Sequence, residues 1–154
     1  MNMNSKQLNI LLADDDADDC LFFKEALVEL PMSMNLIAVH DGEQLMHLLI
    51  NETIDLPDIL FLDLNMPRKN GFECLSEIKS SEKLKRLPVI VFSTSFEQEV
   101  VNRLYSNGAH YFIRKPSEFS QYKKIIQQSL ELVDQGVLTK PAREDFVLTV
   151  KKIL

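Results

Sequence analysis

Polar residues at five positions of this sequence could cooperate in phosphate and metal chemistry. Asp14 and Asp15 follow an apolar run near the amino terminus, and Asp63 follows a later run. Ser93 and Lys115 each follow a further apolar run. Carboxylates are ligands that Mg²⁺ prefers, and a hydroxyl with an ammonium group can bond and neutralise phosphate oxygens. The five residues therefore predict a site for Mg²⁺-dependent phosphoryl transfer.

Each of these residues taken singly has a simpler structural explanation. Aspartates that follow a strand commonly cap the next helix, so we expect Asp16 to be a cap and Asp18 and Asp19 to lie at the positive end of that helix. We assign these three residues no chemistry. A single Asp or a Lys-Pro pair after a strand is often only a turn. The case for a site rests on four of five predicted strands placing compatible groups at one edge.

Five short apolar runs predict the strands of a parallel sheet. Four of the runs lack alternation between apolar and polar residues, as strands that are covered on both faces do. Between the runs, apolar residues recur with helical spacing, which predicts five amphipathic helices. Right-handed crossovers would place these helices on both faces of the sheet. The runs comprise residues 8–12, 36–39, 59–62, 89–92 and 111–113.

The predicted fold is an α/β, flavodoxin-like, doubly wound five-stranded parallel sheet with strand order 2-1-3-4-5. Ligands of such sheets bind beyond the carboxyl ends of the strands, where the strand order reverses. That point lies between strands 1 and 3, so Asp14, Asp15 and Asp63 should converge there. Two like charges ~4 Å apart repel by about 4 kcal/mol at an effective dielectric constant of 20. A hard divalent cation such as Mg²⁺ would offset this repulsion.

The overall composition fits one domain without a nucleic-acid or membrane partner. The chain has 154 residues, with 17 basic and 23 acidic residues and a net charge of −6. This charge argues against binding to nucleic acid or to an anionic membrane. The absence of a signal peptide or a long apolar run leads us to expect a cytoplasmic protein. Cys20 and Cys74 are predicted to be reduced thiols, and His40, His47 and His110 lack the spacing of metal ligands.

Four segments around the candidate residues resemble the signature segments of response-regulator receiver domains. The resemblance covers roughly residues 8–134, which we predict to be the receiver domain, between an amino-terminal tail at 1–7 and a carboxy-terminal extension at 135–154. The four segments are ILLADD at 10–15, LDLNMP at 62–67, LPVIVFS at 87–93 and RKP at 114–116.

The resemblance implies a role for each acidic residue of the candidate site. In that family the Asp at the place of Asp63 accepts a phosphoryl group from a sensor histidine kinase or a phosphotransfer protein. The acidic pair at Asp14 and Asp15 would bind Mg²⁺ together with Asp63 and the backbone carbonyl of Asn65. The chain would then be a phosphoacceptor signalling domain rather than an enzyme, assisting only its own phosphorylation and dephosphorylation.

The resemblance also implies a conformational switch. Ser93 would turn toward the phosphoryl group, and Lys115 would pair with one of its oxygens. The switch aromatic is Phe112, where the family often has Tyr, so any signal carried by a Tyr hydroxyl is lost. Tyr111 belongs to the other face of the strand. The Asp-rich first loop, the Ser-Thr-Ser segment after strand 4 and the short extension look most like stand-alone regulators of bacterial phytochrome-type kinases.

The carboxy-terminal extension is predicted to form a further helix. Residues 139–141, Thr-Lys-Pro, resemble a helix entry with Pro in the first turn. We expect the apolar stripe of this helix to pack on helices 4 and 5 of its own domain or of a second copy, which would support a homodimer through helix 4, strand 5 and helix 5. A strand through residues 146–150 is the alternative, because this run is rich in β-branched residues. The stripe consists of Phe146, Val147, Val150 and Ile153.

Three other functions compete with the phosphoacceptor interpretation. A flavodoxin-like electron carrier cradles a phosphate in its first loop, which Asp14, Asp15 and Asp16 would repel. A phosphatase of the haloacid-dehalogenase type needs a carboxylate two residues after its nucleophile, where this chain has Asn65. The remaining alternative is a receiver-like protein-binding module that acts without phosphorylation. The intact set of candidate residues argues against this last alternative.

Overall fold

Strands and helices alternate along the chain, as the sequence predicts. The computed structural model describes residues 7–51, 55–134 and 140–150. The bounds of the elements are β1 (Leu8–Ala13), α1 (Ala17–Val28), β2 (Met34–Val39), α2 (Gly42–Ile50), β3 (Ile59–Leu62), α3 (Gly71–Ser80), β4 (Val89–Ser93), α4 (Gln98–Ser106), β5 (Tyr111–Arg114), α5 (Phe119–Asp134) and the short 3₁₀ helix η1 (Arg143–Asp145).

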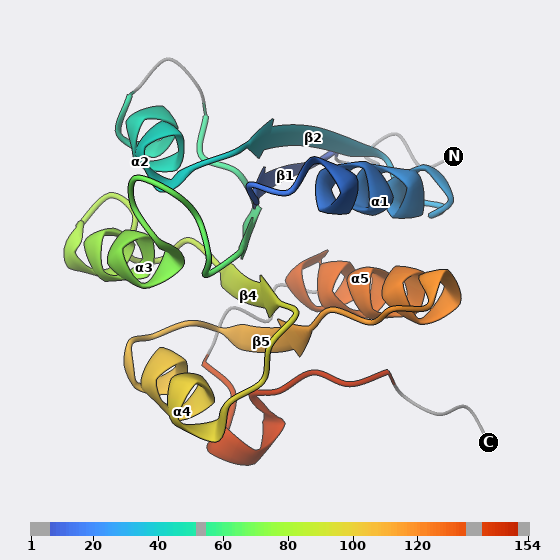
Figure 1. The fold of residues 1–154 in the computed structure, drawn as a ribbon. Helices are drawn as coiled ribbons and strands as arrows, with labels where there is room; N and C mark the ends of the chain where they lie inside the picture. Colours follow the sequence, from blue (N-terminus) through green and yellow to red (C-terminus); the bar gives the residue numbers. More distant parts are fainter. Residues whose placement is uncertain (1–6, 52–54, 135–139, 151–154) are drawn as a thin grey trace.

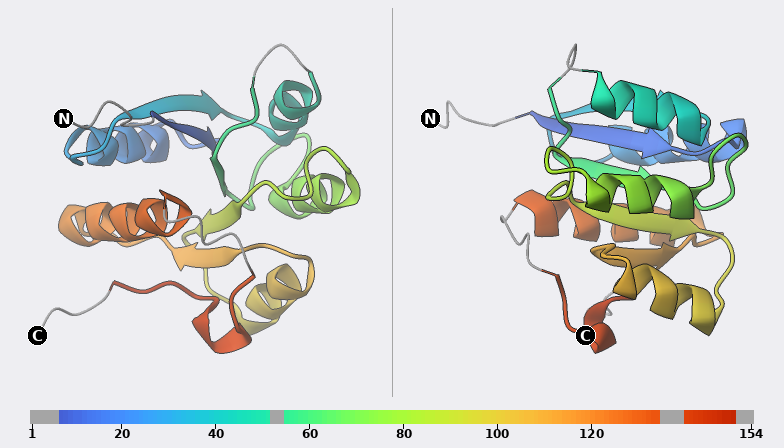
Figure 2. Two further views of the ribbon diagram at one scale, coloured as in Figure 1. Left: turned by 180° about the vertical axis from the view of Figure 1, so that it is seen from behind. Right: turned by 90° about the vertical axis from the view of Figure 1, so that its left-hand side faces the viewer.

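The five strands form one parallel sheet between two layers of helices. Their order is β2-β1-β3-β4-β5, which confirms the predicted flavodoxin-like arrangement. Helices α1 and α5 cover one face, and α2, α3 and α4 cover the other (Figures 1 and 2). Because β1 and β3 are neighbours at the centre, the loops that follow them meet at the same edge of the sheet.

The core is divided into two halves by the sheet. Successive strand residues point to opposite faces, so Leu11 packs with α2, α3 and α4 while its neighbour Leu12 packs with α1 and α5. All residues of β3 and β4 are buried, which explains why their sequences show no alternation. Among the described residues, no helix combines the length and the apolar character that a membrane span requires.

Side-chain caps begin the first three helices close to the strand ends. The carboxylate of Asp16 accepts hydrogen bonds from the N–H groups of Asp18 and Asp19, and that of Asp41 accepts one from Gln44. The predicted capping role of Asp16 is thereby confirmed. These caps satisfy N–H groups that have no partner inside the helix. They fix where α1 and α2 leave the sheet.

The carboxy-terminal segment, residues 140–150, runs beside β5 and is not the predicted helix (Figure 1). It contains only η1 and a single parallel bridge between Val147 and Phe112. The N–H of Phe112 donates to the Phe146 carbonyl at 3.0 Å, and the N–H of Leu148 donates to the Phe112 carbonyl at 2.9 Å. An edge strand has backbone N–H and C=O groups without a partner. A segment must be extended to form hydrogen bonds with these groups. The alternative of strand pairing is therefore closer to the structure, although Thr139 and Ile153 lie outside the described residues.

The apolar side chains of this segment cover the edge of the sheet on both faces. The side chain of Phe146 has no exposed surface, and its ring contacts that of Tyr105 on α4 in an edge-to-face arrangement, with centroids 5.2 Å apart. Val147 packs with the α2–α4 side of the core, while Leu148 and Val150 pack with the α1–α5 side. The segment therefore packs against α4, β5 and α5 of its own domain. Packing on its own domain was one of the two expected arrangements, the other being packing on a second copy.

Candidate metal and phosphoacceptor site

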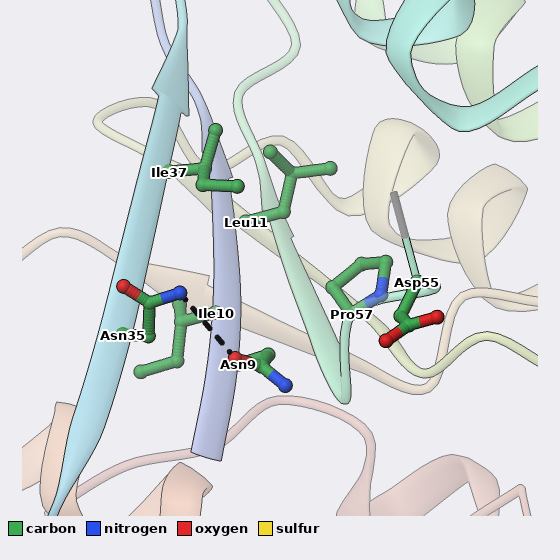
Figure 3. Close-up of a pocket in the computed structure, with 7 residues that line it drawn as sticks. All are labelled: Asn9, Ile10, Leu11, Asn35, Ile37, Asp55 and Pro57. Carbon is green, nitrogen blue, oxygen red and sulfur yellow. Dashed lines mark hydrogen bonds between the residues drawn. The ribbon is translucent and has the colours of Figure 1, made fainter. Parts of the chain in front are cut away.

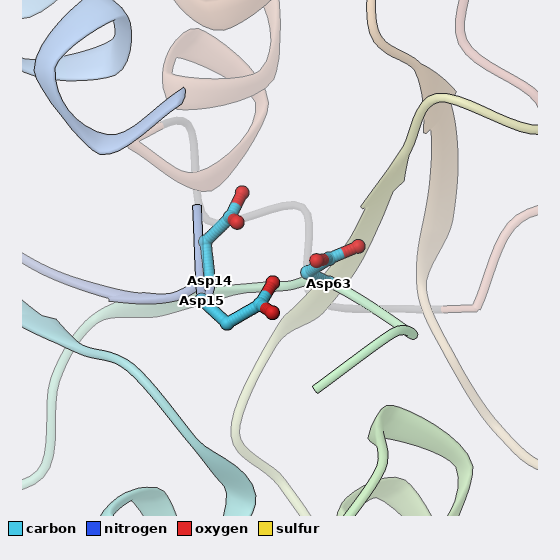
Figure 4. A group of neighbouring side chains, drawn as sticks. All are labelled: Asp14, Asp15 and Asp63. Atoms are coloured by element: carbon cyan, nitrogen blue, oxygen red, sulfur yellow. The ribbon is translucent and has the colours of Figure 1, made fainter. Parts of the chain in front are cut away.

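Three carboxylates converge at the carboxyl ends of β1 and β3, as predicted. Asp14 and Asp15 follow β1, Asp63 follows β3, and one oxygen from each side chain lies within 4.8 Å of the others (Figure 4). The N–H of Asp63 donates to the Ala13 carbonyl at 2.9 Å, which extends the pairing of the two strands into the site. Asp14 and Asp63 are buried, whereas Asp15 is exposed. The cluster could hold a divalent cation.

The environment of Asp63 disfavours its charged form. Burial and the neighbouring Asp14 carboxylate raise the pKa of Asp63 to about 6, although the Lys115 ammonium and the backbone N–H of Asn65 act in the opposite direction. At neutral pH the carboxylate is therefore ionised but held at an energetic cost. A cation bound beside it would reduce that cost. The backbone N–H of Asn65 points to this carboxylate, whereas metal ligation by the Asn65 carbonyl stays a prediction.

The loop after Asp63 returns tightly into α3. The side chain of Asn70 caps α3, and Asn70 and Glu73 together form a reciprocal capping box. The N–H of Gly71 donates to the Leu64 carbonyl at 2.9 Å. A Cβ atom at Gly71 would lie 2.4 Å from the carbonyl oxygen of Asp63, which is closer than atoms can approach. Glycine at this position thus allows α3 to begin directly against the backbone of the acceptor candidate.

Lys115 supplies the positive charge at the same edge. Its ammonium donates hydrogen bonds to Asp14 Oδ2 at 2.7 Å and to Asp19 Oδ2 at 2.8 Å, and its side chain is only 6% exposed. Burial alone would lower the pKa of Lys115, but these two bonds raise it above its ordinary value. The lysine therefore stays charged, and it lies opposite the acids as the sequence predicts.

The contact between Asp19 and Lys115 is one that the sequence analysis did not predict. We expected Asp19 only to complement the positive end of α1. With Asp16 as the cap, Asp19 occupies the third position of the helix, from which a side chain points back toward the helix start. Because α1 starts at the edge that carries Asp14, this orientation brings Asp19 to Lys115. The spacing from the cap was the signal that could have revealed the contact.

Ser93 and Phe112 lie on the neighbouring strands β4 and β5, where Phe112 pairs with Val91, and both residues are fully buried. Ser93 ends β4, and its hydroxyl lies 3.3 Å from both the N–H and the hydroxyl of Ser95. The N–H of Lys115 donates to the Ser93 carbonyl at 2.8 Å, so β4 and β5 hold the two predicted residues next to each other. The ring of Phe112 contacts that of Phe96 in the loop after β4, with centroids 5.8 Å apart.

The two cysteines and the buried histidine have structural roles. Cys20 and Cys74 are free thiols, and burial raises their pKa values to about 11 and about 12. Both therefore remain protonated and poorly reactive at neutral pH. His110 accepts a hydrogen bond through Nδ1 from the N–H of Val89 at 3.2 Å, which ties the start of β5 to the start of β4. The contact of His110 is therefore structural.

A pocket also opens at the opposite end of β1, away from the carboxylates (Figure 3). Asn35 donates a hydrogen bond to Asn9 across its wall at 3.5 Å. The pocket lies beside the amino-terminal half of β1, whereas the carboxylate cluster lies beyond the carboxyl end of that strand. It is therefore separate from the candidate site. The pocket is lined by Asn9, Ile10, Leu11, Asn35, Ile37, Asp55 and Pro57.

Comparison with known proteins identifies the family of this arrangement. Residues 10–127 match the family model of the response regulator receiver domain. The chain is 31% identical to the probable methanogenesis regulatory protein FilR2 of Methanothrix harundinacea over 79% of this chain and 81% of that protein. It is 33% identical to the response regulator Rcp1 of Synechocystis sp. over 77% of this chain and 83% of that protein.

A solved structure shares the same fold over almost the whole chain. The phosphorylated cyanobacterial phytochrome response regulator RcpA is 33% identical to this chain, with a TM-score of 0.79 over 89% of this chain and 100% of RcpA. The family model, the relatives and the position of the carboxylates at the ends of β1 and β3 all agree. This chain belongs to the response regulator receiver domain family, whose members are signalling modules of two-component systems that interact with histidine kinases or phosphotransfer proteins.

Proposed function

We propose that this chain is a response regulator that accepts a phosphoryl group on Asp63 from a sensor histidine kinase. The observation that carries the proposal is the convergence of three carboxylates with a buried, charged lysine at one sheet edge. In the reaction, an oxygen of the Asp63 carboxylate attacks phosphorus, an O–P bond forms, and the P–N bond to the donor imidazole breaks. The imidazole leaves with the bonding electron pair and takes up a proton. The output is a change in protein–protein contacts.

The metal of this reaction is Mg²⁺, and the residues present suit it. Asp14, Asp15 and Asp63 would hold the ion together with the carbonyl of Asn65, and oxygen ligands of this kind are those that Mg²⁺ prefers. When bound, the ion offsets the charge of the carboxylates and of the incoming phosphoryl oxygens. The related Rcp1 has been solved in a Mn(2+)-bound form, which supports a divalent cation at this site.

Lys115 and Ser93 would complete the site around the phosphoryl group. The ammonium of Lys115 is charged and shielded from solvent, so it can pair with a phosphoryl oxygen more strongly than an exposed lysine would. The hydroxyl of Ser93 lies at the end of β4 and can donate a hydrogen bond to another phosphoryl oxygen. The protein thereby positions groups and neutralises charge, as phosphoryl transfer requires.

Replacing Asp15 by Ala is expected to weaken Mg²⁺ binding by about tenfold or more, because the ion loses one of its few protein ligands. The measurement is calorimetric titration of the unphosphorylated protein with Mg²⁺. Asp15 is exposed, so this substitution should leave the fold intact. Asp18→Ala is the matched control, since it removes an exposed carboxylate from the adjacent helix. Equal Mg²⁺ affinities of the two variants would remove Asp15 from the metal site.

Ser93 and Phe112 would form the switch that reports phosphorylation. Phe112 is already fully buried, and both its N–H and its carbonyl form hydrogen bonds with the segment 140–150. A hydroxyl drawn toward the phosphoryl group would change the packing between the end of β4 and this ring. In the Ser93→Ala variant we expect phosphorylation at Asp63 without the amide chemical-shift changes across residues 96–130 that the wild type shows. Identical shift changes in both proteins would exclude this route of coupling.

A phytochrome-type histidine kinase is the partner that the comparisons favour. RcpA, which shares the fold over its whole length, is a cyanobacterial phytochrome response regulator. Homodimerisation through α4, β5 and α5 stays a prediction, and the segment 140–150 already packs on part of that surface. The alternative function, a binding module that acts without phosphorylation, is disfavoured by the buried ion pair of Lys115 and Asp14.

A further inference from the structure

The ammonium of Lys115 is shared between two carboxylates of different origin. Asp14 extends from the end of β1, whereas Asp19 lies on α1. The two N–O distances, 2.7 Å and 2.8 Å, are both typical of charge-assisted hydrogen bonds. By contrast, the charge of Lys115 affects Asp63 through space, without a hydrogen bond between the two side chains. Lys115 is therefore held on the α1 side of the site.

The contacts of Asp14 show why the second carboxylate bound to Lys115, that of Asp19, matters. Asp14 Oδ1 accepts a hydrogen bond from the N–H of Asp16 at 3.0 Å, and Asp14 Oδ2 accepts one from Lys115. Both oxygens are thus engaged before any cation binds. A metal ion that binds Asp14 would weaken the hydrogen bond between Asp14 and Lys115. Asp19 is not a member of the three-carboxylate cluster, so a cation held by that cluster would not need to draw on the carboxylate that bonds Lys115.

We propose that Asp19 is a positioning residue that restrains Lys115 and slows phosphoryl transfer to Asp63. This inference rests on the proposed function, because it concerns the group that pairs with the incoming phosphoryl oxygens. The negative charge of Asp19 partly neutralises the ammonium and competes with the phosphoryl group for it. It also repels the phosphoryl charge itself. Asp19 thereby sets how readily the site accepts a phosphoryl group, without touching the reacting atoms.

The test is the Asp19→Asn variant, which keeps an oxygen acceptor for Lys115 but removes the charge. With acetyl phosphate as donor and at saturating Mg²⁺, the rate constant of phosphorylation should rise about threefold, a modest effect because Asp19 is partly exposed. Intact-mass time courses measure the phosphorylated fraction. Asp19→Glu retains the carboxylate and should return the rate toward that of the wild type. A residue that only stabilises α1 would not produce this dependence on charge.

Asp18→Asn is the matched control, because it makes the same change in net charge one residue away. Asp18 is exposed, and the two hydrogen bonds of the Lys115 ammonium go to Asp14 and Asp19. Its rate should equal that of the wild type. A rate in Asp19→Asn equal to the control, or slower than it, would overturn the inference and assign Asp19 a structural or a preorganising role. Failure of the wild type to become phosphorylated would instead refute the proposed function, so the two failures are distinguishable.

Discussion

The Asp63→Asn variant is expected to gain no phosphoryl group under conditions that fully label the wild type. The amide has the shape of the carboxylate but lacks the nucleophilic oxygen of an anion, so no acyl phosphate can form. The wild type should gain one phosphoryl group only when Mg²⁺ is present, because the added charge of about −1.5 to −2 must be offset beside two carboxylates. Intact-mass measurement with acetyl phosphate, with and without a chelator, tests both statements. A phosphoryl group on the variant would place the acceptor elsewhere.

The stability of the same variant shows whether it is folded and also tests the environment of Asp63. The folded-state pKa of Asp63, about 6, lies above its ordinary value of 3.8, so the folded protein binds the proton more tightly than the unfolded chain. Ionisation of Asp63 therefore lowers the free energy of unfolding as the pH rises through this interval. Asp63→Asn removes this cost in the metal-free protein. Above pH 6 the variant should exceed the wild type by up to about 3 kcal/mol in unfolding free energy.

Urea unfolding of the metal-free proteins between about pH 4 and about pH 8 gives the difference directly. The gain should be smallest at the acid end, where Asp63 is neutral in the folded protein and only about half ionised in the unfolded chain, and should level off above pH 6. Asp18→Asn controls for the change in net charge, since Asp18 is exposed. A difference that does not vary with pH would contradict the raised pKa of Asp63.

The Phe146→Ala variant is expected to lose about 3 kcal/mol of unfolding free energy. If residues 140–150 bind the rest of the domain with a smaller free energy than this, the loss equals that smaller value. The Phe146 side chain has no exposed surface and contacts the ring of Tyr105. Its removal leaves a cavity at the edge of the sheet. The backbone bonds that join Phe112 to Phe146 and Leu148 should then open more often. Thermal melting measures the first effect, and amide hydrogen exchange at Leu148 measures the second.

Thr149→Ala provides the comparison for this experiment. The Thr149 side chain is exposed, and the bond from Gln128 goes to the backbone carbonyl of Thr149, which the substitution retains. Its melting temperature and amide exchange should match those of the wild type. If Phe146→Ala behaves like Thr149→Ala in both measurements, the buried Phe146 side chain contributes nothing to the stability of the domain.

The central part of the fold and site could be predicted because local patterns express it directly. Strands buried on both faces read as continuous apolar runs, and parallel strands bring the residues after them to one edge. Asp14, Asp15 and Asp63 were therefore expected to converge, and they do. The contact between Lys115 and Asp19 joins two elements far apart in the chain. The spacing of Asp19 from the cap indicates where its side chain points, but no residue near Asp19 in the sequence identifies Lys115 as its partner.

The carboxy-terminal segment could not be predicted for a related reason. Phe146, Val147 and Val150 have the spacing of a helical stripe, and a local interpretation favours a helix. The outcome depends on the free backbone groups at the edge of β5, which the sequence of the segment does not encode. Bonding the N–H and carbonyl of Phe112 requires an extended partner, and this demand outweighs the local preference.

The sequence separation of the site residues has a consequence for folding kinetics. The bonds of Lys115 to Asp14 and Asp19 close loops of 101 and 96 residues, so they form only after most of the sheet has assembled. A nascent or partly folded chain holds its three carboxylates without this counter-charge. In such a chain the proposed acceptor site is incomplete even though Asp63 is present. Competence for phosphorylation should therefore arise late and cooperatively, when the last strand–helix unit docks, and the rate of labelling during refolding would report that final step.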